Sequence, residues 1–243
     1  MRWLRRRRLF DGVLEGLVNF RDLGGLPAEG GTVRPGVLFR SDSLAYATRA
    51  DVHRLVDGLG VTTVIDLRGE HEVARLGRGP LARTRVGYYP APIADVSGAD
   101  DLVGHYLAML AEKGDVLAGT VRLLASSDAL PAVFHCEAGC DRTGVLAAVV
   151  LGLLGVPDDA IAEDYAATAA AMPTIHERVR VVVERLGLPP RPLSVTVWEP
   201  EAAMMAHTLD LVRQRWGGMD GWAREQGLRD EDLSALRSAL ILS

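Results

Sequence analysis

Short apolar runs alternate with longer stretches of helical periodicity along this chain of 243 residues. Four runs have the length and the apolar or β-branched composition of buried strands, at residues 37–40, 61–67, 86–91 and 131–134. Between them, apolar residues three or four positions apart indicate amphipathic helices. Because strands and helices alternate, the pattern predicts a single α/β domain with a central, mostly parallel sheet of about four or five strands flanked by helices.

The predicted helices have recognisable ends. Thr48 is placed to cap a helix that begins at residue 49, and Asp158 or Asp159 can cap one that begins at residue 160. Further helical segments lie at residues 100–126, 145–154, 160–171, 173–186, 200–216 and 230–242. We expect residues 173–186 to pack on the core, with a place in a lid as the alternative. A glycine-rich turn is expected to join the last two helices.

Composition narrows the class of protein. A chain of this length with 48% hydrophobic residues can bury one sizeable core. The formal net charge of −5 argues against a general nucleic-acid binder. Residues 1–14 form a basic N-terminal arm, which we expect to be disordered and solvated rather than bound to an anionic membrane surface. The arm lacks the apolar region of a secretory signal, and the longest apolar run, residues 143–157, is too short to span a bilayer.

The chain has two cysteines, Cys136 and Cys140, four positions apart. Such a pair does not make a disulfide framework, so a reducing cytoplasm is the expected location. Cys140 can act as a resolving thiol toward Cys136 or simply fill its position, and we prefer the second interpretation. No other cluster has the spacing of metal ligands, so we expect neither a metal nor another cofactor.

Both cysteines belong to the segment HCEAGCDRTG, residues 135–144, which we call the cysteine loop. It lies between a predicted strand and a predicted helix. Successive backbone N–H groups in such a turn can surround an anion, and a helix N-terminus adds partial positive charge. The same field stabilises Cys136 as a nucleophilic thiolate. Gly139 permits the turn, and the planar fork of Arg142 can hold two phosphate oxygens.

This chemistry predicts covalent cleavage of phosphate esters. Cys136 would attack phosphorus to form a cysteinyl-phosphate that water then hydrolyses, and the Thr143 hydroxyl would stabilise the sulfur. The groups expected to bind the phosphate are Arg142 and the backbone of Glu137, Ala138, Gly139 and Cys140. The alternative is an inert, buried cysteine next to an arginine that makes an ordinary surface ion pair.

The cysteine loop resembles the signature loop of the cysteine-dependent protein tyrosine phosphatase superfamily. Similarity to its bacterial tyrosine/lipid phosphatase branch extends to residues 19–25, 34–42, 64–68 with Glu72, and 217–222. The resemblance implies a tyrosine-phosphatase-like catalytic domain over residues 15–243, with extra lid and C-terminal helices. It also implies a phosphoric monoester hydrolase that needs no cofactor and acts on phosphorylated protein, as a tyrosine or dual-specificity phosphatase.

The resemblance assigns further residues. It makes Asp141 the expected general acid, with Asp95 on a separate loop as the alternative. It implies that His135 orients the loop through a hydrogen bond. Charged groups near the strand ends are expected to form a supporting network beneath the phosphate site, namely Arg21, Asp22, Arg40, Asp42, Asp66 and Arg68.

One departure from the branch concerns the substrate. The related loops usually have lysine at the position of Cys140, where it adds positive charge for multiply phosphorylated head groups. The alternative substrate is a small phosphorylated metabolite, such as a nucleotide, an inositol phosphate or a phosphoinositide. A non-catalytic phosphate-binding module and a rhodanese-like sulfurtransferase are the alternatives from other classes, and the intact set of Cys136, Asp141 and Arg142 argues against both.

Overall fold

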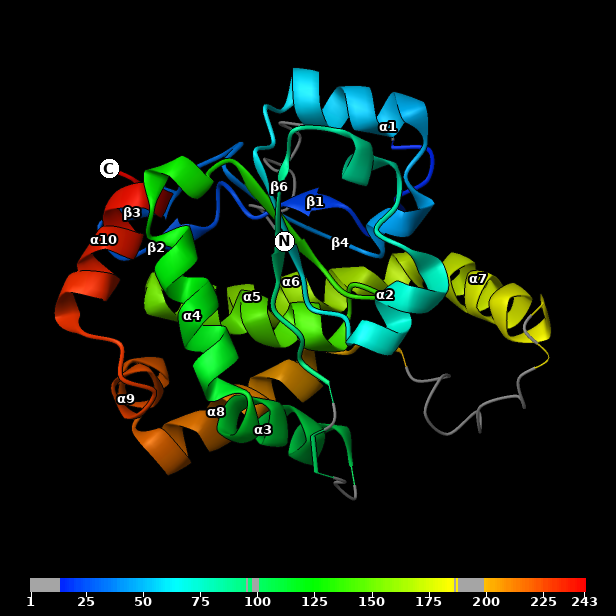
Figure 1. The fold of residues 1–243 in the computed structure, drawn as a ribbon. Helices are drawn as coiled ribbons and strands as arrows, with labels where there is room; N and C mark the ends of the chain where they lie inside the picture. The colour runs from blue at the N-terminus through cyan, green and yellow to red at the C-terminus, as the bar shows by residue number, and fades with distance from the viewer. Residues whose placement is uncertain (1–13, 95, 98–100, 186, 188–198) are drawn as a thin grey trace.

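The computed structural model describes residues 14–94, 96–97, 101–185, 187 and 199–243 (Figure 1). At its centre is a five-stranded sheet in the order β1-β4-β7-β5-β6. These strands are β1 (Arg21–Asp22), β4 (Leu38–Ser41), β5 (Thr63–Asp66), β6 (Gly87–Pro90) and β7 (Ala132–His135). The last four are parallel to one another, and β1 runs antiparallel at the edge. The predicted α/β fold with a mostly parallel central sheet is therefore confirmed.

Helices cover both faces of this sheet, with α1 on one side and α4 and α5 on the other (Figure 1). The first five are α1 (Arg49–His53), α2 (Glu70–Leu76), α3 (Leu102–Glu112), α4 (Gly114–Leu124) and α5 (Asp141–Leu153). They are followed by α6 (Asp158–Ala166), α7 (Met172–Arg185), α8 (Ala202–Trp216), α9 (Met219–Glu225) and α10 (Asp230–Leu240). Short turns of other helix types connect them, at Leu44–Tyr46, Arg54–Gly58, Pro80–Arg83, Ser127–Ala129 and Ala167–Ala171.

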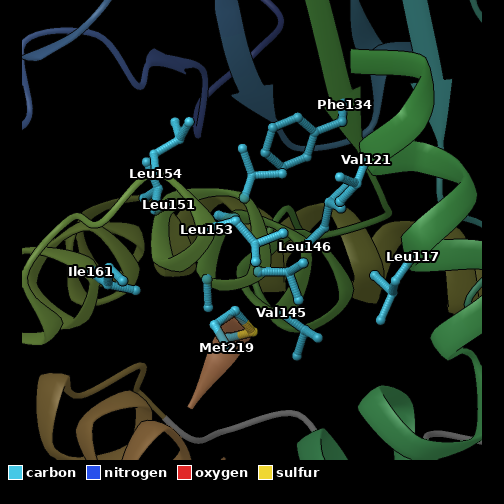
Figure 2. Close-up of a cluster of buried hydrophobic side chains, with 14 of the residues drawn as sticks. Leu117, Val121, Phe134, Val145, Leu146, Leu151, Leu153, Leu154, Ile161 and Met219 are labelled. Carbon is cyan, nitrogen blue, oxygen red and sulfur yellow. The ribbon is translucent and has the colours of Figure 1, made fainter. Parts of the chain in front are cut away.

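Neighbouring residues of each central strand belong to opposite sides of the sheet. Ile65 and Phe134 pack in the large cluster around α5, whereas the adjacent Val64 and Val133 pack in a second cluster beneath α1. Figure 2 shows Phe134 in the large cluster above Leu146 of α5. Because both faces are covered, these strands appear in the sequence as continuous apolar runs rather than as alternating ones.

The structure corrects several predicted helix boundaries. The helix expected over residues 100–126 is divided at Lys113, which lies between the last residue of α3, Glu112, and the first residue of α4, Gly114. A side chain at position 114 would lie 2.1 Å from Gln226 Oε1, so this junction packs tightly on the C-terminal part of the chain. The helix expected at residues 145–154 already begins at Asp141, since residues 141–144 are helical but too polar for an apolar pattern to detect.

The predicted capping roles have different outcomes. Thr48 caps α1 as expected, because its side chain accepts a hydrogen bond from Asp51 N. Asp158 and Asp159 do not cap α6, where Pro157 occupies the N-cap position without a side-chain hydrogen bond. Both aspartates instead lie in the first turn, where their negative charge interacts favourably with the helix dipole.

The C-terminal region differs most from its prediction. The expected glycine-rich turn between the last two helices contains α9, whose Trp222 is fully buried and donates from Nε1 to Leu110 O at 2.9 Å. The helix expected to reach residue 242 ends at Leu240. Beyond it, β8 (Ile241–Leu242) joins β2 (Pro27–Ala28) and β3 (Gly31–Val33) in a second sheet of order β2-β3-β8. Strands of two or three residues are too short to show a periodic pattern.

Most of the expected N-terminal arm, residues 1–13, lies outside the described residues. Leu14 is only 6% exposed and packs in the second cluster together with Leu17. Among the helices of the described ranges, none is long and apolar enough to cross a membrane.

Leu146 lies at the centre of the large cluster, so shortening it tests the packing. Leu146→Ala leaves a cavity between α5 and the sheet and should lower the free energy of unfolding by about 2–5 kcal/mol. Val181 on α7 is 43% exposed, so Val181→Ala is the matched control and should have little effect. Urea unfolding of both variants measures the difference, and equal losses would contradict the assigned core.

Candidate active site

The cysteine loop lies at the carboxyl edge of the parallel strands, as the sequence predicts. In the register of the sheet, His135 at the end of β7 is opposite Ser41 of β4 and Asp66 of β5. The loop therefore begins between the two segments that follow those strands. This edge is where open α/β sheets bind ligands.

Gly139 forms the tight turn of the loop, with φ of +70°. A side chain there would lie 2.5 Å from Ser41 O, so residue 139 must be glycine for steric as well as conformational reasons. The Gly139 amide donates to Cys136 Sγ at 3.3 Å. Cys136 is only 2% exposed, and its sulfur already accepts one backbone hydrogen bond.

The carbonyl groups of the turn are held from outside the loop. Asn19 Nδ2 donates to the carbonyl oxygens of both Ala138 and Gly139, each at 3.0 Å. Arg40 donates from Nη2 to the same Gly139 oxygen at 2.8 Å. Asn19 is itself fixed, because its backbone amide donates to Asp42 Oδ1 at 3.0 Å. These bonds hold the carbonyls outward, an arrangement that leaves loop amides available to an anion.

Arg142 is oriented by a two-point ion pair with Glu72 of α2. Its Nη1 and Nη2 donate to the two carboxylate oxygens at 2.6 and 2.9 Å. Burial disfavours the charged guanidinium, but the negative charges of Cys136 and Glu72 outweigh it and raise the pKa of Arg142. A guanidinium has five N–H donors, so three remain for a ligand.

Asp141, the first residue of α5, is linked to two tyrosines, directly to Tyr106 and through it to Tyr165. Tyr106 Oη donates to Asp141 Oδ1 at 2.7 Å and lies 2.7 Å from Tyr165 Oη. Burial raises the pKa of Asp141 above its usual range, although the Tyr106 hydrogen bond acts in the opposite direction. The carboxyl group therefore keeps its proton to higher pH than an exposed aspartate does.

Thr143 and Cys140, both residues of the cysteine loop, are buried. The hydroxyl oxygen of Thr143 has no hydrogen-bond partner within the described part of the protein, so it remains available. The Cys140 thiol is 1% exposed, and burial raises its pKa well above the usual value. It therefore stays protonated, as expected of a side chain that packs rather than reacts.

The supporting charges form two groups rather than the single network that we predicted. In the first, Asp164 of α6 binds both Arg21 and Arg40. Its Oδ1 accepts from Arg21 Nε at 3.0 Å, and its Oδ2 accepts from Arg40 Nη1 at 2.5 Å. Asp164 and Arg40 are 1% and 0% exposed, so this carboxylate neutralises charge inside the protein.

The second group surrounds Asp66 at the end of β5. Arg68 donates to its two oxygens from Nε and Nη2 at 2.9 and 2.7 Å. His135 Nδ1 lies 3.0 Å from Cys136 O, while its Nε2 lies 3.6 Å from Asp66 Oδ2. Burial lowers the pKa of His135 to about 4, so at neutral pH the imidazole is uncharged and contacts the backbone at the nucleophile position.

The other predicted residues have separate positions. Asp22 accepts hydrogen bonds from the amides of Gly24 and Gly36 at 2.8 and 2.7 Å, and so fixes two turns. Asp42 accepts from Arg178 Nη1 of α7 at 3.0 Å, which ties that helix to the site. Asp95, the alternative acid, lies outside the described residues.

Sequence patterns assigned no role to several residues of this site. Asn19 and Glu72 were visible only as members of matching motifs, and Tyr106, Asp164 and Tyr165 only as parts of predicted helices. Their common feature is that they come from elements distant in sequence from residues 135–144. In the part of the chain that is described, no group of three or more His, Cys, Asp or Glu side chains is arranged to hold a metal ion.

A mainly apolar pocket opens between α2 and α7 beside the loop. Its walls are Glu72, Arg75, Leu76, Glu137, Val179, Val182 and Val183. The three valines, expected to pack in the core or in a lid, are half-buried along this pocket. Glu137 accepts from Tyr46 Oη at 3.2 Å, and burial raises its pKa.

These features are those of a phosphatase site, and comparison with known proteins identifies the family. Residues 13–242 match the tyrosine phosphatase family, so the chain belongs to it. It is 28% identical to the triple specificity protein phosphatase PtpB of Mycobacterium tuberculosis, over 94% of this chain and 98% of that one. The chain is also 30% identical to a Cupriavidus necator protein named as a tyrosine-protein phosphatase, over 88% of this chain and 83% of that one.

Among solved structures, the core catalytic domain of the PP-IP phosphatase SIW14 from S. cerevisiae, in complex with citrate, matches 63% of this chain and 90% of that one. Its TM-score is 0.38 and its sequence identity is 14%.

Asp164 neutralises two guanidinium groups, and its removal tests how far the site depends on it. Asp164→Asn leaves the buried Arg40 without a counter-charge and should lower the free energy of unfolding by about 3–5 kcal/mol. Asp158→Asn, in the same helix, removes an exposed ion pair to Arg213 and a first-turn charge, and should cost less than about 1 kcal/mol. Chemical denaturation of both variants tests this, and equal stabilities would show that Arg40 does not need Asp164.

Proposed function

We propose that this phosphatase hydrolyses phosphate monoesters by covalent catalysis at Cys136. The observation that carries the proposal is the buried sulfur with a backbone donor at 3.3 Å, next to an arginine fixed by two hydrogen bonds. The loop amides and the three free donors of Arg142 bind the phosphate oxygens.

In the first step, the Cys136 thiolate attacks phosphorus while the bond from phosphorus to the ester oxygen breaks. Asp141 gives its proton to that leaving oxygen, which departs as an alcohol or phenol. Because burial raises its pKa, Asp141 is suited to holding that proton. In the second step, water attacks the cysteinyl-phosphate and Asp141 accepts a proton from it. Phosphate leaves and the thiolate is restored.

Thr143 and His135 have supporting roles in this proposal. The unpaired Thr143 hydroxyl is available to donate to the sulfur when it becomes the leaving group of the second step. The neutral His135 holds the backbone at Cys136 and does not itself transfer protons. Both thiols are free in the structure, which suits catalysis in a reducing compartment such as the cytoplasm.

The proposed substrate is a phosphotyrosine residue of a protein. The pocket beside the loop has apolar walls from Leu76 and from the valines of α7, a surface suited to an aromatic ring. Two carboxylates, Glu72 and Glu137, and one guanidinium, Arg75, line the same pocket, and Glu72 is already paired with Arg142. The apolar walls are therefore the reason for preferring phosphotyrosine to a multiply phosphorylated metabolite, and release of phosphate from a panel of phosphopeptides, inositol phosphates and nucleotides compares them.

Replacing the nucleophile should abolish turnover without unfolding the protein. Cys136→Ser is expected to lower phosphate release from a phosphotyrosine peptide by roughly three orders of magnitude or more. Cys140→Ser preserves the backbone of the loop and should retain at least about a tenth of the wild-type rate. Substantial activity of Cys136→Ser, with its fold verified by thermal unfolding, would refute the covalent mechanism.

The assignment of the acid predicts a dependence on the leaving group. Asp141→Asn should slow phenyl phosphate hydrolysis by about 10²–10⁴-fold, because phenol leaves poorly without a proton. With p-nitrophenyl phosphate, whose leaving group needs no proton, the loss should be much smaller. Asp95→Asn tests the alternative acid and should show no such difference. The reverse pattern would transfer the role to Asp95.

A further inference from the structure

Two buried tyrosines from separate helices converge on Asp141. Tyr106 of α3 and Tyr165 of α6 are 0% and 1% exposed. Their rings meet edge to face, with centroids 6.0 Å apart and an interplanar angle of 76°. Their hydroxyl oxygens lie 2.7 Å apart, and Tyr106 Oη is also 2.7 Å from Asp141 Oδ1. The proposed mechanism gives neither hydroxyl a role.

The number of protons fixes the direction of this chain. Each tyrosine hydroxyl has one proton to donate. Tyr106 donates its proton to Asp141, so Tyr165 must donate to Tyr106. Because Oδ1 is already an acceptor, the proton of the neutral Asp141 carboxyl group belongs on Oδ2.

We propose that Tyr165 and Tyr106 form a hydrogen-bonded relay that positions Asp141 and sets which of its oxygens carries the acid proton. The inference rests on the proposed function, in which Asp141 is the general acid. Both tyrosines act through Asp141 and are positioning residues rather than catalytic ones.

The relay resolves a conflict between the two steps of the reaction. Burial raises the pKa of Asp141 and so favours the protonated form that the first step needs, but the second step begins with its carboxylate. A donated hydrogen bond stabilises the carboxylate form and so limits the effect of burial. The other titratable groups that face Asp141 are Arg142 of its own helix and His105 of α3, and the positive charge of Arg142 acts in the same direction as the hydrogen bond.

Close packing keeps the relay in place. A side chain at Gly144, in the first turn of α5, would lie 2.9 Å from Cδ2 of the Tyr165 ring. The ring therefore rests directly on the backbone of the helix that carries Asp141. Cys140, at the N-cap of α5, lies on the same side, and its side chain makes a hydrogen bond with Tyr165.

The test is the pH dependence of kcat with phenyl phosphate, whose leaving group needs the acid. Tyr106→Phe removes the donor to Oδ1, so the pKa of Asp141 rises and the alkaline limb of the profile moves to higher pH by about one unit. Tyr165→Phe should move it in the same direction by less than half as much. The double variant should match Tyr106→Phe, because Tyr165 acts only through Tyr106.

Two controls separate this effect from a general loss of structure. Tyr89 is 48% exposed on β6, and Tyr89→Phe should leave the profile unchanged. Because His105 can also carry charge near Asp141, the profiles are repeated with His105→Gln, where the shift should persist.

The outcomes distinguish the relay from the mechanism on which it rests. If the alkaline limb does not move in either phenylalanine variant while Asp141→Asn still shows its leaving-group effect, the relay is refuted and the acid assignment stands. Additive shifts in the double variant would refute the order of the relay. If Asp141→Asn lacks the leaving-group effect, the proposed acid itself is wrong, and the relay is refuted with it.

Discussion

The outward anchoring of the loop carbonyls is the constraint on which the rest of the site depends. A loop whose amides must stay free for an anion cannot use those amides to satisfy its own carbonyls. Here Asn19 and Arg40 supply the missing donors to Ala138 and Gly139. Arg40 is fully buried and so requires the Asp164 carboxylate, which places α6 beneath the loop. One polar requirement thus organises the N-terminal segment, a central strand and a helix that follows the loop.

The other arginines of the site are also paired with carboxylates. Arg68 is paired with Asp66, and Arg142 is paired with Glu72, each through two hydrogen bonds. Buried ion pairs contribute little net stability, because the cost of removing both charges from water offsets their attraction. Their evident contribution is geometric, since a planar guanidinium held at two points cannot rotate. The structure therefore uses charge pairs to fix directions, while the apolar clusters around α5 supply the driving force for folding.

In the proposed mechanism, specificity and acid chemistry arise from groups at the rim of this framework. The α7 helix contributes three valines to the pocket and an arginine, Arg178, that binds Asp42. Opposite it, α3 and α6 surround Asp141 with tyrosines. Cys140 stands where related loops usually have lysine, and its buried, neutral thiol adds no charge to the site. These features support the proposed substrate, a phosphotyrosine residue.

The sequence by itself determined the central strands, the helix that follows the loop and the position of the loop with Cys136, Asp141 and Arg142. These features are local: an apolar run of strand length, or a cysteine between a strand and a helix, is visible in adjacent residues. Tertiary structure alone decided that Asp22 fixes turns and that Asp66 and Asp164 belong to separate groups. It also decided that Glu72 and Tyr106 reach the site, and that residues 241–242 form a strand. Such contacts join positions as far apart in the sequence as Thr32 and Leu242, which are partners in the second sheet, and no local pattern encodes them.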